Sequence, residues 1–298
     1  MAERRTRYSN LTTIRVSGDR FRKEHWPSFL FNGRLASALG EWPWTDVFMS
    51  AETSNLLLST LSAAIVGVGD AIGQFDRANL LRAVRSDGVI VKPDEAIVPL
   101  DASYVARASD PSAPIIAAAR TRHGGSITSY VFAFIPQSPP DPPPASARSR
   151  PSSTGHAGED RGGHATFSPA ALGYRGPVYA YDYFNGSGIF LRAPEDVVNL
   201  AVPDDGAYWI VVPVGPSGVG FLGDAGKFVS NGRTRIAHLH DTGTLSARVV
   251  FAGSACMDFR RDARRSALHA RASSASPTTA GPGGSSSTWL PSLAARRW

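Results

Sequence analysis

The order of apolar and polar positions divides the chain into stretches that differ in texture. Between residues 14 and 93, short apolar runs alternate with segments of helical spacing. In chain order the pattern predicts an extended segment at 14–17, a helix at 26–39, an extended segment at 46–49, a helix at 54–61, a buried strand at 64–68 and a helix at 76–84. Asp76 is a suitable N-cap for the last helix. This alternation of strand and helix is typical of parallel βα units.

From residue 97 onward the pattern changes to β-structure. Short apolar or alternating runs are separated by turn pairs such as Asp205 and Gly206. The predicted strands cover residues 114–119, 129–135, 178–183, 208–214, 219–222 and 245–251. We therefore expect an antiparallel β-sandwich after the βα units, so that the chain is an α+β protein with more than one domain.

Two segments fit neither pattern. Residues 136–165 contain seven prolines and few apolar side chains, so they bury too little surface to offset the entropy of ordering. After residue 255 the sequence becomes rich in Arg, Ala and Ser. We therefore divide the chain into βα units at 1–93, a sandwich at 94–255 that contains a disordered insert at 136–165, and a disordered basic tail at 256–298.

The amino-acid composition limits the kinds of cofactor, metal site and partner that the chain is expected to have. The 298 residues are 42% hydrophobic, which is enough for a substantial core, and Cys256 is the only cysteine. A lone cysteine forms neither an internal disulfide nor a cysteine zinc site, and we predict no metal and no cofactor. The net charge of +6 lies mostly in residues 256–298, where seven Arg against two Asp give +5. The remaining +1 over residues 1–255 argues against a nucleic-acid partner.

The chain carries no evident membrane or export signal. No window approaches 18 consecutive apolar residues, and the first twenty residues lack the apolar stretch of a secretory signal. We therefore predict no membrane partner and leave the compartment open.

Two short motifs give only weak evidence for a nucleotide-binding loop and for a metal site. The run GVGFLG at 218–223 has the spacing of a dinucleotide-binding loop, but no helix pattern follows it that could hold a pyrophosphate. A turn-rich β-segment is the favoured interpretation, and a nucleotide-dependent oxidoreductase ranks third among the hypotheses. His238 and His240 could place two imidazoles on one face of a strand, but two histidines without a third ligand are more often surface residues.

Three acids accompany the three predicted strands of the first region. Asp19 follows the first strand, Asp46 lies at the second, and Asp70 follows the third. In a parallel α/β barrel the carboxyl ends of the strands face the substrate, so these side chains are candidates for one site. Each of them also suits an ordinary helix cap or turn.

The same stretch resembles a known family. The residues concerned are RVSGD at 15–19, WTDVFMS at 44–50, AIVGVGD at 64–70 with Gly73, and LLR at 80–82 leading to SDGVI at 86–90. In order and spacing they are similar to the last three βα units of glycoside hydrolases of the α-galactosidase and raffinose-synthase type. The resemblance covers roughly residues 14–255 apart from the insert. It implies the end of an eight-stranded TIM-type barrel followed by a β-sandwich.

The resemblance also implies roles for individual residues. Asp19 matches the general acid/base that these enzymes carry after the sixth strand, and Arg15 matches an arginine four residues before it. Asp46 matches the second acid of an Asp-Trp-Asp-Met-Phe motif, and Trp44 stands in place of the first. With Asp19 as the catalytic residue, Arg15, Trp44, Asp46 and Asp70 are expected to bind an α-linked sugar.

The family's nucleophile lies on the fourth barrel strand, before the part that this chain resembles. We therefore expect a fragment of an α-galactosidase-like glycoside hydrolase that is inactive alone, because the reaction needs both carboxyl groups. A partial parallel sheet would also expose an edge through which copies could associate. The alternative is a noncatalytic carbohydrate-binding or partner-binding β-sandwich, in which Trp209, Tyr181 and Tyr183 would stack on sugar rings.

Overall fold

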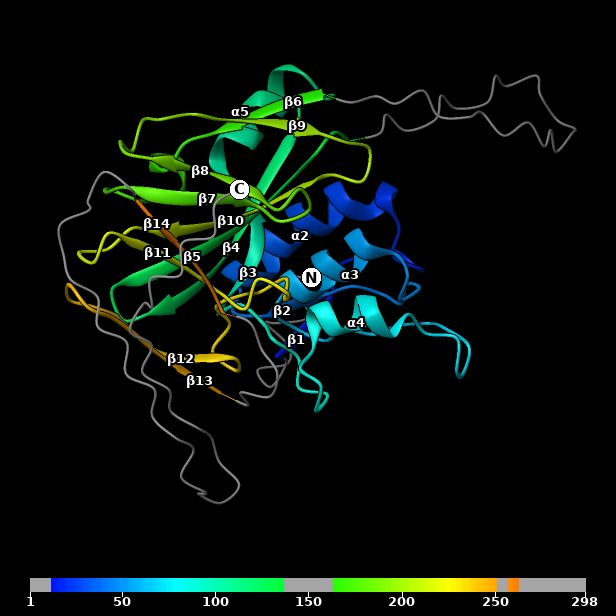
Figure 1. The fold of residues 1–298 in the computed structure, drawn as a ribbon. Helices are drawn as coiled ribbons and strands as arrows, with labels where there is room; N and C mark the ends of the chain where they lie inside the picture. The colour runs from blue at the N-terminus through cyan, green and yellow to red at the C-terminus, as the bar shows by residue number, and fades with distance from the viewer. Residues whose placement is uncertain (1–11, 137–162, 251–256, 263–298) are drawn as a thin grey trace, which may run out of the picture.

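The fold is built around one antiparallel sheet of six strands. The computed structural model describes residues 12–136, 163–250 and 257–262 (Figure 1). In spatial order the strands are β3(Glu95–Pro99), β4(Ile115–His123), β5(Ser126–Phe134), β10(Ala207–Pro213), β7(Val178–Asp182) and β8(Ser187–Leu191). All neighbours in this order are antiparallel, so the expected antiparallel β-structure is confirmed.

Both faces of this sheet are apolar and buried. On the two central strands, Phe132 and Tyr208 enter one core, while Val131 and Val211 enter another. The alternation follows from strand geometry, in which successive side chains point to opposite faces. A strand that is covered on both faces needs a nearly continuous apolar run, and residues 130–134 provide one.

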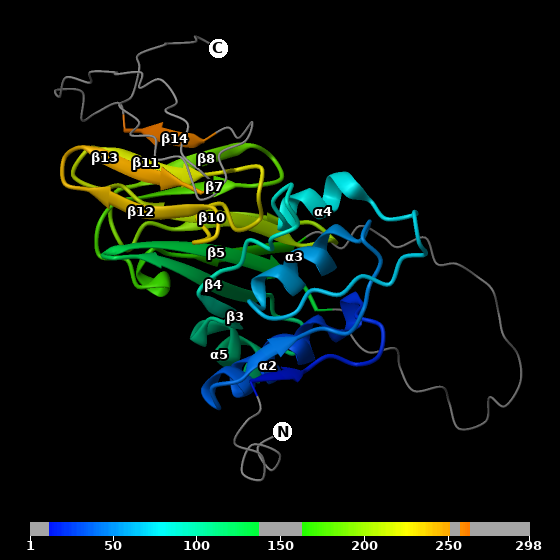
Figure 2. The same cartoon turned by 90° about the horizontal axis from the view of Figure 1, so that it is seen from below.

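Helices α2(Trp26–Ala38) and α3(Thr53–Leu61) cover the first face of the sheet (Figures 1 and 2). In α2 the buried residues recur at helical spacing on the side that faces the strands, whereas α3 is buried on nearly all sides. Trp26 packs edge-on against Phe132 and Phe134, with ring centroids 5.5 and 5.3 Å apart. On this face the sheet is therefore covered by helices of the N-terminal region, and the β-sandwich expected for residues 94–255 stays a prediction.

The second face is covered by the two-stranded sheet of β6(Gly163–Phe167) and β9(Val198–Val202) and by a turn at Ala170–Leu172. Gly163 to Ala165 were expected to belong to the disordered insert, and the structure corrects this because they pair with β9. The rest of the insert, residues 137–162, lies outside the described residues.

The Tyr174 hydroxyl links the segment after the turn at Ala170–Leu172 to the six-stranded sheet by hydrogen bonds. It lies 3.0 Å from Ser129 Oγ and 2.9 Å from the Val211 carbonyl oxygen. Burial raises the pKa of this phenol, so it remains protonated and able to donate. A polar link of this kind fixes the register between two otherwise apolar surfaces.

The N-terminal region contains parallel pairing. β1(Thr13–Arg15) pairs with β2(Trp42–Trp44), and Phe48 forms a further parallel bridge with Val68.

Two of the predicted strands differ from the structure. The second lies at 42–44 rather than 46–49, and the third, expected at 64–68, is reduced to the single bridge at Val68. Glycine on both sides of Val68 weakens extended pairing, and Pro43 has no N–H to donate within the second strand. Short strands therefore replace the longer ones that apolar runs alone suggested.

The remaining elements lie around this frame. They are η1(Lys23–His25), α4(Arg77–Ala83), α5(Asp101–Ser109), the pair β11(Val219–Gly223) with β14(Asp258–Arg261), and the pair β12(Ile236–Asp241) with β13(Leu245–Val249). Asp76 caps α4 by accepting the Asn79 N–H, as predicted. β14 corrects the expected disorder of the tail at 258–261, whereas residues 263–298 lie outside the described residues.

The main hydrophobic core draws on both sides of the boundary expected at residues 93 and 94. It joins Phe21, Phe29 and Leu57 of the N-terminal region to Tyr130 and Tyr208 of the sheet. None of these side chains retains more than 1% of its accessible surface. The two parts are thus joined through shared apolar packing.

A long loop at 224–235 adds a second connection. The Phe228 N–H donates to the Arg82 carbonyl, and the Lys227 ammonium donates to the Leu81 carbonyl. The loop itself is closed by Asp224 and Arg235, whose side chains form a buried ion pair at 2.7 Å. Residues that are 146 positions apart in sequence are therefore held against each other.

Candidate functional site

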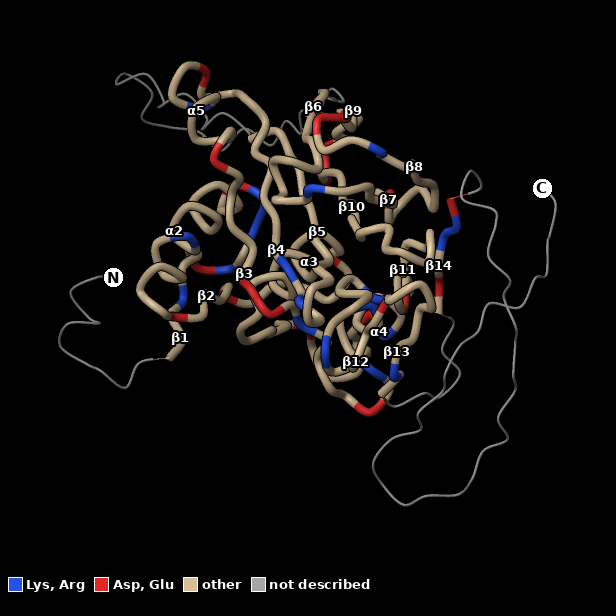
Figure 3. The backbone as a smooth tube through the Cα atoms, turned by 90° about the vertical axis from the view of Figure 1, so that its left-hand side faces the viewer, with Lys and Arg blue, Asp and Glu red and all other residues tan. Residues whose placement is uncertain are grey.

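Three of the five predicted site residues meet at the carboxyl ends of the two parallel strands. Arg15, the last residue of β1, contacts Asp19 Oδ1 at 2.9 Å through one guanidinium nitrogen and Asp46 Oδ1 at 3.2 Å through the other. Figure 3 shows acidic and basic positions close to one another where β1, β2 and α2 meet. The parallel pairing brings the ends of both strands to one edge, which is why residues 27 positions apart share one arginine.

Asp46 is the more firmly held of the two acids. Its Oδ2 accepts the Arg20 N–H at 2.7 Å, and its own N–H donates to Ser17 Oγ at 2.8 Å. The backbone N–H of Arg20, a second N–H from Val47 and the Arg15 guanidinium lower the pKa of Asp46. Asp46 is therefore ionised at neutral pH and suited to accept hydrogen bonds rather than to supply a proton.

Arg20 adopts an unusual backbone conformation at this point. Its φ of 49° lies in the left-handed region, which residues other than glycine rarely occupy. This conformation directs its N–H at the Asp46 carboxylate. Strain of this type concentrates at functional sites, where surrounding contacts hold it in place.

Asp19 differs from Asp46 in exposure. Its side chain is 91% exposed, against 22% for Asp46, and its contact with Arg15 holds it at the rim. An exposed carboxyl group beside a fixed one is accessible to a ligand from solvent. The pair thus combines one exposed acid with one firmly held acid around a common cation.

Trp44 lies next to this cluster, and its position follows from strand register. It is the direct partner of Arg15 in the parallel pair, so the two side chains point to the same face. The Val16 N–H donates to the Trp44 carbonyl at 3.0 Å and fixes that register. Trp44 is half-buried, which leaves part of its indole accessible.

Asp70 is not joined to the Arg15 cluster by any contact within the described residues. Its two carboxylate oxygens accept from Ser50, one from the hydroxyl at 2.9 Å and one from the N–H at 2.8 Å. The same hydroxyl accepts the Asp76 N–H. Asp70 therefore organises the loop before α4, and its expected contact with sugar stays a prediction.

Sequence reasoning missed Ser17, Arg20 and Glu52. Glu52 lies 3.7 Å from the Arg20 guanidinium, and its Oε2 accepts from the Asn55 amide and the Met49 N–H. An acid immediately before a helix was a signal for Glu52, since it stands at the N-cap position of α3. No sequence pattern pointed to Ser17 or Arg20, because their roles depend on how the loop after β1 closes.

The other motifs occupy ordinary structural positions. His238 and His240 are exposed on β12, with a bulge between the strands beside them. Among the described residues, no group of three or more His, Cys, Asp and Glu is arranged to hold a metal ion. GVGFLG forms β11 and leads into turns, not into a helix, as the favoured interpretation of that motif predicted.

The aromatic residues of the binding-module hypothesis do not form one platform. Tyr181 and Tyr183 pack against the core beneath α2 and α3, whereas Trp209 packs against the core on the opposite face. Burial raises the pKa of Tyr183 to about 12, which reflects its low contact with water. The three rings therefore lie on separate faces, and the binding-module hypothesis stays a prediction.

Comparisons with known proteins give the following result. No protein-family model matches the chain, and the search of curated proteins finds no match. Within the described part of the chain, no helix is both long enough and apolar enough to cross a membrane.

Solved glycoside hydrolases are similar in structure. A family 27 β-L-arabinopyranosidase from Geobacillus stearothermophilus matches with 11% identity and a TM-score of 0.47, over 71% of this chain and 47% of its own. A variant of that enzyme in complex with arabinose matches with 10% identity and a TM-score of 0.40, over 66% and 44%. A candidate α-N-acetylgalactosaminidase from Bacillus halodurans matches with 12% identity and a TM-score of 0.40, over 65% and 44%. The chain spans less than half the length of the solved structures it matches.

Proposed function

We propose that residues 12–93 contribute the acid/base side of a site that cleaves α-linked sugars. One observation carries the proposal: Arg15 holds Asp19 and Asp46 together at the ends of two adjacent parallel strands. In an enzyme with parallel βα units this edge faces the substrate. The sequence resemblance to α-galactosidase-type glycoside hydrolases names the same residues, from motifs that do not depend on these contacts.

The chemistry assigns different tasks to the two acids. Asp19, exposed and adjustable, would protonate the leaving glycosidic oxygen and later take a proton from the attacking water. Asp46, ionised and fixed by backbone N–H groups, would accept hydrogen bonds from sugar hydroxyls. Arg15 would position both carboxylates, and the half-exposed Trp44 indole would lie against the apolar face of the sugar ring.

A complete reaction needs a second carboxyl group to attack the anomeric carbon. In the family that the sequence resembles, the nucleophile belongs to an earlier barrel strand than β1. We therefore expect the chain by itself to be catalytically incomplete, with a loss of about 10⁴- to 10⁶-fold in rate. The partial barrel is part of this proposal, as are the substrate class and the site roles.

Two measurements test the site and its incompleteness separately. With an aryl α-galactoside, the purified chain is expected to give no turnover above that of Asp19→Asn. Clear turnover would refute the incompleteness, and its loss in Asp19→Asn would at the same time support the role of Asp19.

Binding tests the pocket edge without requiring turnover. Addition of methyl α-galactoside should shift the Trp44 indole signal in a ¹⁵N NMR spectrum, assigned by its absence in Trp44→Phe. Asp46→Asn should weaken this binding at least about tenfold, because a charged hydrogen-bond acceptor is lost. Asp101→Asn, an exposed acid paired with Arg34, is the matched control. Equal binding by both variants would count against the site.

The open side of the parallel pair suggests self-association. Within the described residues β1 pairs only with β2, and Val47, Ile65 and Val68, at or close in sequence to the Phe48–Val68 bridge, remain 42%, 50% and 37% exposed. Parallel sheets are normally covered on both faces, so this surface favours a partner, which we take to be a second copy. Sedimentation between about 1 and 100 µM should show association that Ile65→Asp reduces and Val105→Asp, on exposed α5, does not. A concentration-independent monomer would refute it.

A further inference from the structure

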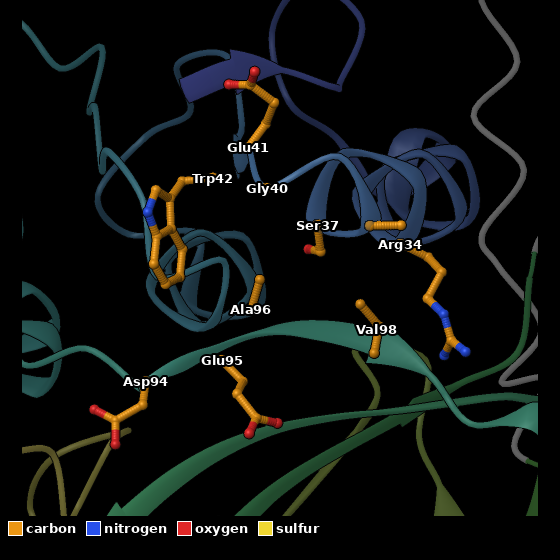
Figure 4. A pocket seen from close by; sticks show the side chains of 10 residues that line it. Arg34, Ser37, Gly40, Glu41, Trp42, Asp94, Glu95, Ala96 and Val98 are labelled. Carbon is orange, nitrogen blue, oxygen red and sulfur yellow. The ribbon is translucent and has the colours of Figure 1, made fainter. Parts of the chain in front are cut away.

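A cavity lies at the opposite end of β2 from Asp46. It occupies about 460 Å³ between the last turn of α2, the start of β2 and strand β3, as Figure 4 shows. Cavities of roughly 300 to 1,000 Å³ are typical of small-ligand sites. Its lining combines an indole, a hydroxyl, charged groups and two aliphatic side chains of β3, and it includes Ser37, Trp42, Asp94, Glu95, Ala96 and Val98. None of these residues belongs to the carboxylate cluster described above.

Trp42 forms one wall of the cavity. Its backbone is fixed because its N–H donates to the Thr12 carbonyl and it pairs with Thr13 in the parallel register. Its side chain nevertheless remains 41% exposed, and no other described ring stacks on it. Figure 4 shows the indole on one side of the space and Ser37 on the other, above the strand that carries Ala96 and Val98. A flat ligand would fit against this indole.

Ser37 supplies an independent observation that points to a ligand. Its hydroxyl oxygen is buried and has no hydrogen-bond partner among the described residues. A buried hydroxyl without a partner is destabilising, since it has lost water and gained nothing in return. Because Ser37 lines the cavity, a ligand that donates or accepts one hydrogen bond there would satisfy its hydroxyl.

The charges around the cavity favour a neutral polar ligand over an ion. Glu95 contacts Arg122 at 2.7 Å and Arg120 at 3.4 Å, and Asp94 contacts Arg233 at 2.8 Å. These carboxylates are already balanced by cations, but each still has lone pairs that can accept from a hydroxyl. An aromatic wall together with several paired polar groups is the chemistry that binds a sugar ring, whose C–H face is apolar and whose edge carries hydroxyls.

We propose that this cavity binds one monosaccharide unit, with the ring against Trp42 and hydroxyls at Ser37 and Glu95. It is a second carbohydrate site, distinct from the carboxylate cluster and without a catalytic role. The proposal does not rest on the proposed glycosidase function, since it uses none of the residues of that site.

The test uses the full chain and the indole signals of its tryptophans in a ¹⁵N NMR spectrum. The Trp42 signal is assigned by its absence in Trp42→Phe, and the probes are galactose, glucose, mannose and arabinose, each added up to about 50 mM to cover weak single-site affinities. We expect at least one sugar to shift the Trp42 signal with saturation. Absence of any shift with all four sugars would overturn the proposal.

Two variants give the decisive comparison. Ser37→Ala should lower the affinity at least threefold and leave the urea midpoint unchanged or higher, because an unpaired buried hydroxyl is removed. A merely structural serine would lower stability instead, and that result would count against the proposal. Trp42→Leu should abolish sugar binding as measured by isothermal titration calorimetry, since this variant lacks the Trp42 signal, with its fold checked by circular dichroism; if it unfolds, Ser37→Ala and Glu95→Gln decide.

The two proposed carbohydrate sites can be tested independently of each other. Asp46→Asn should leave the Trp42 shift intact, while Ser37→Ala should leave the Trp44 shift intact. A Trp42 shift that disappears in Asp46→Asn would assign the sugar to the carboxylate cluster and overturn this proposal. A Trp42 shift with tetramethylammonium but with none of the sugars would show that the cavity prefers an organic cation, which would also overturn it.

Discussion

The six-stranded sheet and the N-terminal region satisfy the hydrogen-bonding groups of their backbones in different ways. The sheet satisfies its backbone through ladders as long as nine paired residues, as between β4 and β5, and buries both faces. The N-terminal region has three-residue strands and isolated bridges, and side chains such as Ser50 and Asn55 hold its loops. Backbone ladders stabilise whole strands, whereas side-chain hydrogen bonds fix the positions of individual residues. The region that is poorer in ladders is therefore the one that gathers the acids.

The largest expected effect tests whether these regions are one cooperative unit. Trp26→Ala removes the ring that packs on Phe132 and Phe134 and the indole N–H that donates to Asn55 Oδ1 at 2.7 Å. We expect a loss of about 3 to 5 kcal/mol, as for other buried large-to-small changes. Urea unfolding followed by fluorescence and circular dichroism should show one shared transition.

Two separate transitions, with the sheet unchanged, would show that the regions are independent. Val105→Ala, a change at a side chain that is 72% exposed, is the control and should alter stability by less than about 0.5 kcal/mol.

The second effect concerns the loop that joins the regions. Asp224→Asn breaks the buried pair with Arg235, whose side chains are 10% and 6% exposed, and should cost about 3 kcal/mol because a buried cation loses its partner. Asp101→Asn breaks an exposed pair at 3.4 Å and should cost less than about 1 kcal/mol. Equal losses in thermal or urea unfolding would mean that burial does not set the strength of these pairs.

A smaller effect is expected where a single hydroxyl holds a loop. Ser50→Ala removes the bonds to Asp70 and to the Asp76 N–H and should cost about 1 to 2 kcal/mol. Amide hydrogen exchange should quicken at residues 70–76 while that of β5 stays the same. Ser28→Ala, which loses one exposed contact with the His25 carbonyl, is the matched control. Uniform quickening across the sheet would contradict a local role.

The smallest effect is a pH dependence within the sheet. Burial lowers the pKa of His123 at the end of β4, although its ring contacts the Asn231 carbonyl at 2.7 Å and Asp94, Arg233 and His238 act on it as well. The folded state therefore binds a proton less readily than the unfolded state. Stability should be full above about pH 6.5 and fall as the pH is lowered toward the folded pKa.

The measurement is the urea midpoint between pH 7.5 and 5. His123→Gln should flatten this dependence, and His240→Gln, at an exposed position, should not. A profile that is unchanged by His123→Gln would show that other groups control the acid limb.

The sequence was informative where a residue's environment is local. Helix 26–38 and the Asp76 cap were predicted because spacing and capping act within a few residues. Four strands of the central sheet were found from their apolar runs, whereas β3 and β8 were missed because their runs are short.

The candidate site shows the same division. Arg15, Asp19 and Asp46 could be grouped from motif order, since parallel strands bring their ends to one edge. The separation of Asp70 could not be predicted, because it depends on Ser50 reaching across a loop. The placement of Tyr181 and Trp209 on opposite faces required the strand pairing, which no single sequence pattern provides.

The loop at 224–235 has a consequence for synthesis of the protein on the ribosome. Leu81 and Arg82 meet their partners Lys227 and Phe228 only after some 146 further residues have been translated. At about 5 to 20 residues per second, the nascent N-terminal region waits roughly 7 to 30 seconds before that support exists. Throughout this interval its apolar surface is available to chaperones and proteases, so the yield of folded protein should depend on translation speed through the later codons.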